Sequence, residues 1–172
     1  MKAEQAITRR RDVLAAVEEY EARLTRYALR LLSDLDLARD AVQHAFVRLC
    51  DEPPLAEDRL AAWLFAVCRN KAFDHLRKTR RDENLAGAAF DSLMGREPDP
   101  ADVAEDGDQA AWVRRQFERL PGPQREVLTL WSEGFGYREI AEITSKSEGN
   151  IRVLVHRGLT SLRELAAASA RA

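Results

Sequence analysis

The sequence contains only two cysteines among its 172 residues, Cys50 and Cys68. Each ends an apolar stretch, FVRLC or LFAVC, in which a free cysteine behaves as a small hydrophobic residue. His44, His75 and His156 are scattered along the chain and form no pair with metal-ligand spacing. The sequence therefore predicts neither a disulfide framework nor a metal site, and no motif indicates a cofactor.

Long apolar segments are also missing. No stretch of about 18 apolar residues without charge occurs, so a membrane span is not expected. The N-terminal segment MKAEQAITRRRDVLAAVEEY lacks the apolar core of a secretory signal, which favours a cytoplasmic location. Alternation of polar and apolar residues with period two is equally absent. The sequence therefore predicts an all-α protein.

The formal net charge of −2 conceals a strong asymmetry along the chain. Residues 82–108 hold nine acidic residues and a single basic one, so this segment carries −8 and the remaining chain carries +6. Glycine and proline recur in the same segment, and its apolar residues follow no period. We interpret residues 82–108 as a flexible acidic linker between two small helical domains, residues 8–81 and 109–168.

Helical periodicity runs through the first domain. One predicted helix buries Leu24, Tyr27, Ala28 and Leu31, which follow the i, i+3, i+4, i+7 spacing of a single face. After an interruption at residues 33–34, Asp36 is the predicted N-cap of a second helix. The apolar face of this second helix comprises Val42, Ala45, Phe46 and Leu49. The prolines at 53–54 end it, and a third helix is expected to begin near residue 57 or 58.

The second domain is expected to contain helices at residues 109–119, 123–133 and 137–143, followed by a last helix capped by Ser147. A tight turn at residues 144–146 joins the last two, which is the pattern of a helix-turn-helix motif. The residues predicted to lie in the core of this domain include Val127, Leu128, Leu130, Trp131 and Tyr137.

The segment WLFAVCRNKAFDHLRKTRR, residues 63–81, combines aromatic and basic residues. From residue 69 onward it has six basic residues and one acidic residue, with Trp63, Phe65 and Phe73 interleaved or just upstream. Cations that follow phosphates and aromatic faces that accept unstacked bases are the means by which proteins hold single-stranded nucleic acid. A basic helix end whose aromatic residues belong to the core is an equally good interpretation of this composition.

This segment resembles the part of extracytoplasmic-function sigma factors that melts and reads the minus-ten promoter element. The residues that match the family pattern are Trp63, Leu64, Arg69, Asn70, Asp74, Leu76, Arg77 and Arg81. The resemblance implies that minus-ten DNA is bound by Trp63, Arg69, Asn70, Lys71, Arg77, Lys78, Arg80 and Arg81.

The upstream segment DLDLARDAVQHAFVRL, residues 34–49, resembles the family helix that docks on the clamp of the polymerase β′ subunit. Asp40, Val42, Gln43 and Phe46 match the family pattern, whereas His44 stands where an acidic residue is usual. The resemblance implies that core polymerase is bound by Asp40, Gln43, His44 and Phe46.

Residues 120–165 resemble the family domain that binds the minus-thirty-five element with a helix-turn-helix. The beginning of its recognition helix is the part that reaches base edges in a major groove. The implied minus-thirty-five contacts are Ser147, Asn150, Arg152, Val153, His156 and Arg157. Lys146, Val153, Leu154 and Gly158 depart from the usual residues of this family. An apolar Val153 could contact a thymine methyl group.

The resemblance implies a sigma factor whose partners are promoter DNA, core RNA polymerase (through the β′ clamp and the β flap) and an anti-sigma factor. The first alternative is a stand-alone helix-turn-helix regulator that binds its operator without polymerase. A second alternative is an enzyme, but the sequence has no nucleophile–base pair, metal cluster or phosphate-binding glycine loop. His156 is better explained by packing or by a DNA backbone contact than by catalysis or metal binding.

Overall fold

A computed structural model describes residues 2–53, 55–82, 112 and 115–169. Every regular element in these ranges is an α-helix, which confirms the predicted all-α class. The chain divides into two compact units, the first built from α1–α3 and the second containing α5 and α7. Apart from its first residue, the predicted linker at 82–108 lies outside the described residues.

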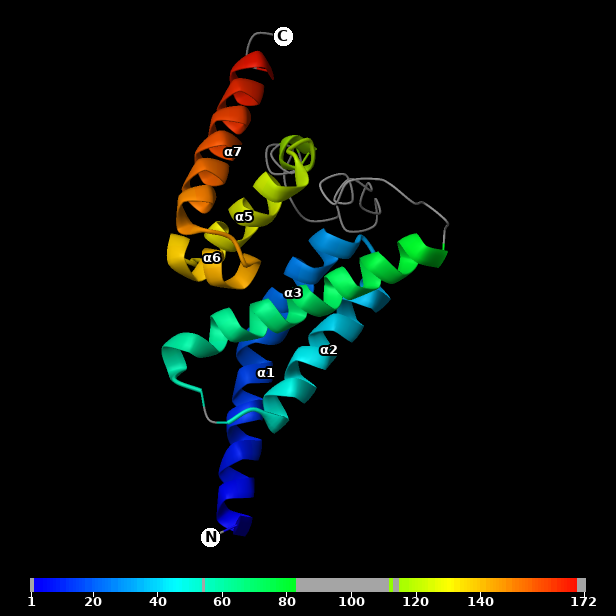
Figure 1. Cartoon of the computed structure of the whole chain (residues 1–172), viewed down its shortest axis with the longest axis vertical. Helices are drawn as coiled ribbons and strands as arrows, with labels where there is room; N and C mark the ends of the chain where they lie inside the picture. The colour runs from blue at the N-terminus through cyan, green and yellow to red at the C-terminus, as the bar shows by residue number, and fades with distance from the viewer. Residues whose placement is uncertain (1, 54, 83–111, 113–114, 170–172) are drawn as a thin grey trace. The chain divides into compact units, whose positions relative to one another are not determined.

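The first unit is a three-helix arrangement. Helix α1 (Lys2–Leu32) is followed by α2 (Leu35–Asp51), which runs back along it, and α3 (Glu57–Asp82) packs against both (Figure 1). The α1 face predicted from its periodicity is buried throughout, with Leu24 and Ala28 fully enclosed. The ring of Tyr27 lies 5.2 Å from that of Phe65, centroid to centroid, and joins α1 to α3 in this core.

The junction between α1 and α2 corrects one prediction. Ser33 adopts a left-handed backbone with φ of 52°, which ends α1. Asp34 then caps α2, because its Oδ1 accepts a hydrogen bond of 2.9 Å from the backbone N–H of Leu37. The predicted N-cap, Asp36, is wrong, since Asp36 already lies in the first turn of α2. There its negative charge faces the positive end of the helix dipole.

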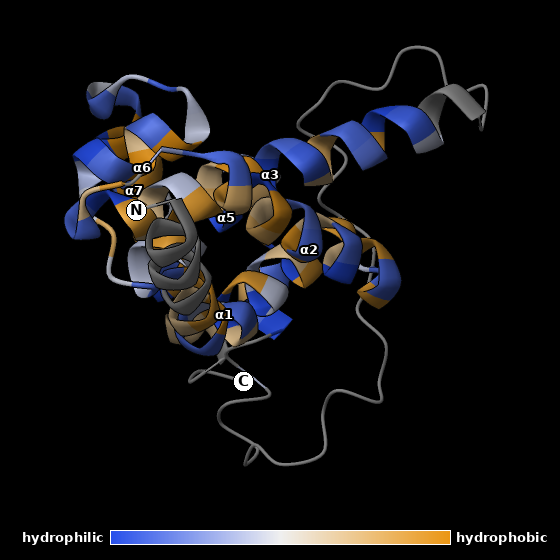
Figure 2. Cartoon of the chain, turned by 90° about the horizontal axis from the view of Figure 1, so that it is seen from below, coloured by the Kyte–Doolittle hydropathy of each residue, from blue (hydrophilic) through white to orange (hydrophobic). Residues whose placement is uncertain are grey.

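Hydrophobic residues of the first unit lie mainly on the facing sides of its helices, whereas the C-terminal half of α3 is predominantly hydrophilic (Figure 2). Phe65 is 0% exposed and Phe73 is 4% exposed, so both belong to the core. For these two aromatic residues the core interpretation is therefore the correct one. Trp63 remains partly exposed.

The second unit contains α5 (Gly122–Ser132), residues 137–141 of α6 (Tyr137–Thr144), and α7 (Glu148–Ser169). Of the helix predicted at 109–119, residues 112 and 115–118 are helical, and residues 109–111 and 113–114 lie outside the described residues. Val127, Leu128 and Leu130 are buried as predicted. Trp131 and Tyr137 are not core residues, because they are 44% and 36% exposed. The buried side of α5 ends at Leu130, and Trp131 projects into solvent.

A tight turn joins α6 to α7, as the helix-turn-helix pattern predicted. Ser145 has a φ of 55°, and the backbone N–H of Lys146 donates to the carbonyl of Ala141 over 3.0 Å, which closes the end of α6. Ser147 caps α7, since its Oγ accepts a hydrogen bond of 3.3 Å from the backbone N–H of Asn150. These contacts fix the start of the recognition helix, where the predicted DNA-binding residues are concentrated.

Helices α5 and α7 approach closely at Gly158. A Cβ atom at this position would lie 2.7 Å from Cδ1 and 3.2 Å from Cγ of Leu128, a side chain that is itself buried. Any larger residue here would force the buried Leu128 side chain to shift, so the packing of α5 on α7 favours glycine although glycine lowers the helix propensity of α7.

Gly158→Ala is expected to destabilise the second unit by about 1 kcal/mol. The gain in helix propensity is about 1 kcal/mol, whereas overpacking against Leu128 costs about 1–3 kcal/mol. Hydrogen exchange of α5 and α7 peptides measures the change. Gly149→Ala is the matched control, because a Cβ there meets no atom within 4 Å. Equal stabilisation by both substitutions would show that Leu128 moves aside without cost.

Candidate nucleic-acid interface

The exposed side of α7 displays every predicted minus-thirty-five residue. Ile151, Val155 and Gly158 are buried on the opposite side, where α7 packs in its own unit. The first three turns of α7 therefore present one continuous polar and basic surface to solvent. The exposed residues at and after the helix start are Ser147, Asn150, Arg152, Val153, His156 and Arg157.

Arg152 is held in a defined position on this surface. Its Nη2 donates a hydrogen bond of 2.6 Å to Oε1 of Glu148, one turn earlier in α7. Its guanidinium also lies 5.6 Å from the centre of the Tyr137 ring, at the start of α6. The Arg152 side chain remains 64% exposed, so the planar donor group is oriented without being covered. Such an oriented guanidinium suits bidentate recognition of guanine or phosphate.

Val153 adds an apolar contact to this basic surface. Its side chain is 46% exposed, and it lies in α7 between Arg152 and Arg157. An exposed valine at the start of a recognition helix has the chemistry to contact a thymine methyl group in the major groove.

The second cluster of predicted DNA-binding residues lies on α3. Asn70, Arg77 and Lys78 are exposed there, and Arg77 is paired with Asp74 over 2.7 Å on the helix surface. Arg80 and Arg81 occupy the last turns of the same helix, but their side chains are outside the described set. The exposed amide and cations lie on the hydrophilic half of α3.

Two of the predicted minus-ten residues occupy different surroundings from their neighbours. The Arg69 guanidinium lies 4.3 Å from the centre of the Phe73 ring, and only 8% of the residue is exposed. The ammonium of Lys71 lies 3.2 Å from Oδ2 of Asp40 on α2. Both cations thus already have partners within the first unit.

Helix α2 carries the predicted polymerase-docking residues. Gln43 is exposed and His44 is partly exposed, whereas Phe46 is only 9% exposed and packs in the core. Val47, which the sequence did not indicate, is 54% exposed on the same side as Gln43. The only sequence feature that could have identified Val47 is that it is an apolar residue outside the buried face of α2.

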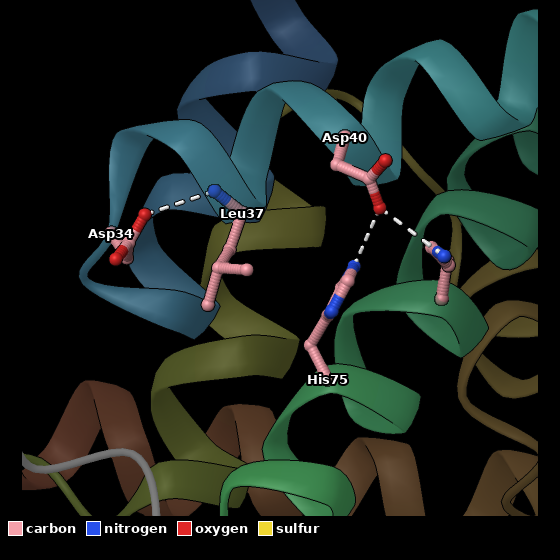
Figure 3. A network of polar contacts seen from close by, with 5 residues as sticks. Asp34, Leu37, Asp40 and His75 are labelled. Atoms are coloured by element: carbon pink, nitrogen blue, oxygen red, sulfur yellow. Dashed lines mark hydrogen bonds and ion pairs between the residues drawn. The ribbon is translucent and has the colours of Figure 1, made fainter.

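Asp40 is the centre of a polar network between α2 and α3 (Figure 3). Its Oδ2 lies 2.8 Å from Nε2 of His75 and 3.2 Å from Nζ of Lys71. The hydrogen bond from Lys71 is the main cause that holds the pKa of Asp40 below its ordinary value; burial opposes it, and the His75 hydrogen bond assists. No sequence pattern indicated a site role for His75, because its partner lies 35 residues away along the chain.

The lowered pKa of Asp40 predicts a specific loss of stability in acid. A carboxyl whose pKa is depressed on folding stabilises the native state above its unfolded pKa, and this contribution disappears as pH falls through the folded value. At pH 5–7 Asp40→Asn is expected to cost about 0.2–1 kcal/mol, because the pair is partly screened by solvent. Hydrogen exchange of α2 and α3 peptides measures the difference. It should vanish well below pH 3.8, the ordinary pKa of this carboxyl; a difference that persists there would contradict the assignment.

The two cysteines differ in their surroundings, and both are free thiols. Cys68 is buried in α3, and desolvation raises its pKa to about 12. Cys50 is exposed near the end of α2. Within the part of the chain that the structure describes, no group of three His, Cys, Asp or Glu side chains could hold a metal ion. Among the same residues, no helix is long and apolar enough to cross a membrane.

Family models match both units in order. The model for sigma-70 region 2 matches residues 16–82, and the model for sigma-70 region 4 matches residues 110–162. The first match covers the three-helix unit with α2 and the basic half of α3, and the second covers the helix-turn-helix with the exposed α7 surface. A chain with both regions is a transcription initiation factor of the sigma-70 class.

Individual relatives narrow this class. The chain is 30% identical to the ECF RNA polymerase sigma factor EcfG of Rhodopseudomonas palustris over 159 residues, covering 91% of this chain and 83% of that protein. It is 30% identical to the ECF RNA polymerase sigma factor SigL of Mycobacterium tuberculosis over 153 residues, covering 87% and 85%. Among solved structures, the sigma factor RpoE from Bartonella quintana, in complex with the anti-sigma factor NepR, is similar at 25% identity. That match has a TM-score of 0.67 and covers 90% of this chain and 96% of the other.

The chain belongs to the ECF family of RNA polymerase sigma factors. It binds core RNA polymerase and directs the enzyme to promoter DNA. The presence of both sigma regions in one chain favours this function over that of a stand-alone helix-turn-helix regulator.

Proposed function

We propose that this chain recognises promoters through two domains joined by a linker. Residues 8–81 act as sigma region 2, residues 109–168 act as sigma region 4, and the acidic segment 82–108 links them. The family matches at residues 16–82 and 110–162 support this division. The chain recruits and directs polymerase in the cytoplasm and catalyses no reaction itself.

The α7 surface binds the minus-thirty-five element as duplex DNA. The observation that carries this assignment is the joint exposure of all six predicted residues around the N-terminal turns of a capped recognition helix. Arg152 reads a guanine, Val153 contacts a thymine methyl group, and Arg157 binds a backbone phosphate. Ser147, Asn150 and His156 complete the contact surface.

The hydrophilic half of α3 binds the minus-ten element. The exposed residues that can contact this DNA are Asn70, Arg77 and Lys78. The basic stretch continues with Arg80 and Arg81. Trp63, which is partly exposed, offers a face on which an unstacked base can rest. Arg69, stacked on Phe73, stabilises the helix that presents these residues.

Helix α2 docks on core polymerase through Asp40, Gln43 and His44, with the buried ring of Phe46 holding the helix in place. The docking partner is the β′ clamp, and the region 4 unit contacts the β flap. The structure of the Bartonella quintana relative is a complex with an anti-sigma factor. We extend that kind of partner to this chain, because a free sigma factor would compete for polymerase continuously.

A pull-down with purified core RNA polymerase, followed by run-off transcription on sheared genomic DNA, tests the function. Stable binding to core and new, discrete start sites are expected. Failure to bind core, together with sequence-specific binding of duplex DNA by the chain alone, would instead establish the stand-alone regulator. The mapped start sites also supply the promoters for the variant experiments below.

A further inference from the structure

The Asp40 network is asymmetric at the carboxylate. Both Lys71 and His75 contact the same oxygen, Oδ2, at 3.2 and 2.8 Å. In Figure 3 two dashed lines meet at this oxygen, one of them from His75, and the second oxygen of Asp40 carries no dashed line and points away from them. Within the described part of the chain, the hydrogen bond and the ion pairs found for Asp40 all join Oδ2 rather than Oδ1. Oδ2 of the carboxylate is thus held by two contacts within the first unit, whereas Oδ1 is left to contact a partner.

Exposure follows the same division. The side chains of His75 and Lys71 are 17% and 28% exposed, so both sit largely between α2 and α3. The Asp40 side chain is 51% exposed. A carboxylate only accepts hydrogen bonds, so Nε2 of His75 must carry the proton in this contact. The two donors therefore contact Asp40 on its side facing α3, and the solvent-exposed side of the carboxylate stays accessible to a partner.

We propose that His75 and Lys71 are positioning residues for polymerase docking, which fix the Asp40 carboxylate so that Oδ1 faces a basic group of core polymerase. A side chain already held in its bound rotamer loses less conformational entropy on binding than a free one. The inference rests on the proposed docking role of α2. It also moves Lys71 from the minus-ten DNA-binding surface, where the family resemblance had placed it, to the docking surface.

The position of the network supports this division of labour. Asp40 is on the helix that carries Gln43 and His44, whereas both of its donors come from α3. Lys71 is both paired with a carboxylate, which partly cancels its field, and only 28% exposed, whereas the paired Arg77 is 65% exposed and stays accessible to phosphate. Lys78, further along α3, is exposed and accessible to DNA.

Variants at residue 75 separate positioning from simple packing. Fluorescence anisotropy of the full-length chain with core polymerase gives the dissociation constant for core. His75→Ala is expected to weaken core binding roughly two- to tenfold, the lower part of the range of coupling between residues in one network. His75→Gln keeps a hydrogen-bond donor within reach of Oδ2, so it is expected to restore most of the affinity. Hydrogen exchange of α1–α3 peptides, measured in parallel, shows whether each variant keeps its fold.

A double-mutant cycle provides the second measurement. In an Asp40→Asn background, His75→Ala is expected to have little further effect on core affinity, because the carboxylate that it positions is gone. In the otherwise wild-type chain, Lys71→Ala is expected to weaken core binding by a factor similar to that of His75→Ala. Arg59→Ala, which removes an exposed cation of α3 outside the network, is the charge-matched control and should leave core affinity unchanged.

Three results would overturn the proposal. The first is wild-type core affinity in a folded His75→Ala variant, and the second is full additivity of the Asp40 and His75 effects. The third is a Lys71→Ala variant with normal core binding whose promoter affinity has a salt slope reduced by about one, the signature of a lost phosphate contact. If wild-type chain fails to bind core at all, the proposed function fails first, so the two failures are distinguishable.

Discussion

Arg152→Ala is expected to lower the affinity of the holoenzyme for its promoters by roughly tenfold to a hundredfold, the value of one bidentate base contact. The effect should be concentrated at a single base pair of the minus-thirty-five element. Glu148 and the Tyr137 ring hold the Arg152 guanidinium on the exposed side of α7, so truncation removes a donor group that is already oriented. Gel shift and run-off transcription on the mapped promoters measure the loss.

Two matched variants make this experiment decisive. Arg152→Lys keeps the charge but loses the planar fork, so it should behave like Arg152→Ala if the contact is to guanine. Arg163→Ala removes an exposed arginine further along α7, outside the proposed contact surface, and should have little effect. If Arg152→Lys is fully active and promoter binding of Arg152→Ala merely loses about one unit of salt slope, the contact is to phosphate. If Arg152→Ala matches Arg163→Ala, Arg152 does not contact DNA.

Phe65→Ala is expected to lower the free energy of unfolding of the first unit by about 3–5 kcal/mol, the usual cost of truncating a buried phenylalanine. The Phe65 ring is 0% exposed, lies 5.2 Å from the Tyr27 ring and lies 5.7 Å from the Arg23 guanidinium. Its removal leaves a cavity where α1 and α3 meet. Faster hydrogen exchange in α1 and α3 peptides, with α5 and α7 peptides unchanged, is the expected result.

Trp63→Ala is the natural counterpart, because it lies two residues upstream in the same aromatic-basic segment. Trp63 is partly exposed, so its loss should affect promoter opening more than stability. Stacking of one base on an aromatic ring is worth about 1–3 kcal/mol. Permanganate footprinting of the opened minus-ten region tests this contrast. A Phe65→Ala chain that keeps its protection from exchange but fails to open DNA would reverse the two roles.

Most of the fold could be predicted because local rules determine it. Breaks at the residue 33–34 junction and the prolines at 53–54 delimit α1, α2 and α3, and apolar spacing identifies their buried faces. The exact N-cap was missed because residues 34 and 36 are both aspartates. Only the left-handed backbone of Ser33, which ends α1 at residue 32, shows which one precedes the helix.

Contacts between helices could not be predicted from the sequence. Trp131 follows the apolar stripe of α5, but it is 44% exposed, and the sequence does not show which side chains pack over α5. The family resemblance placed Lys71 among the DNA-binding residues, and nothing in the sequence indicates its pairing with a carboxylate 31 residues upstream. The exposed α7 residues were predictable, since the recognition helix of a helix-turn-helix has a fixed start and a fixed outer face.

The contrast between the two thiols has a practical consequence. Cys68 is buried with a pKa of about 12, so it holds very little thiolate near neutral pH, whereas Cys50 is exposed. A maleimide dye should therefore label the folded wild-type chain at one position without any engineered cysteine. Cys50 lies two turns after Gln43 and one turn after Val47 in α2, so a dye attached there reports on the neighbourhood of the docking face. The chain thus carries its own attachment point for following assembly with polymerase in real time.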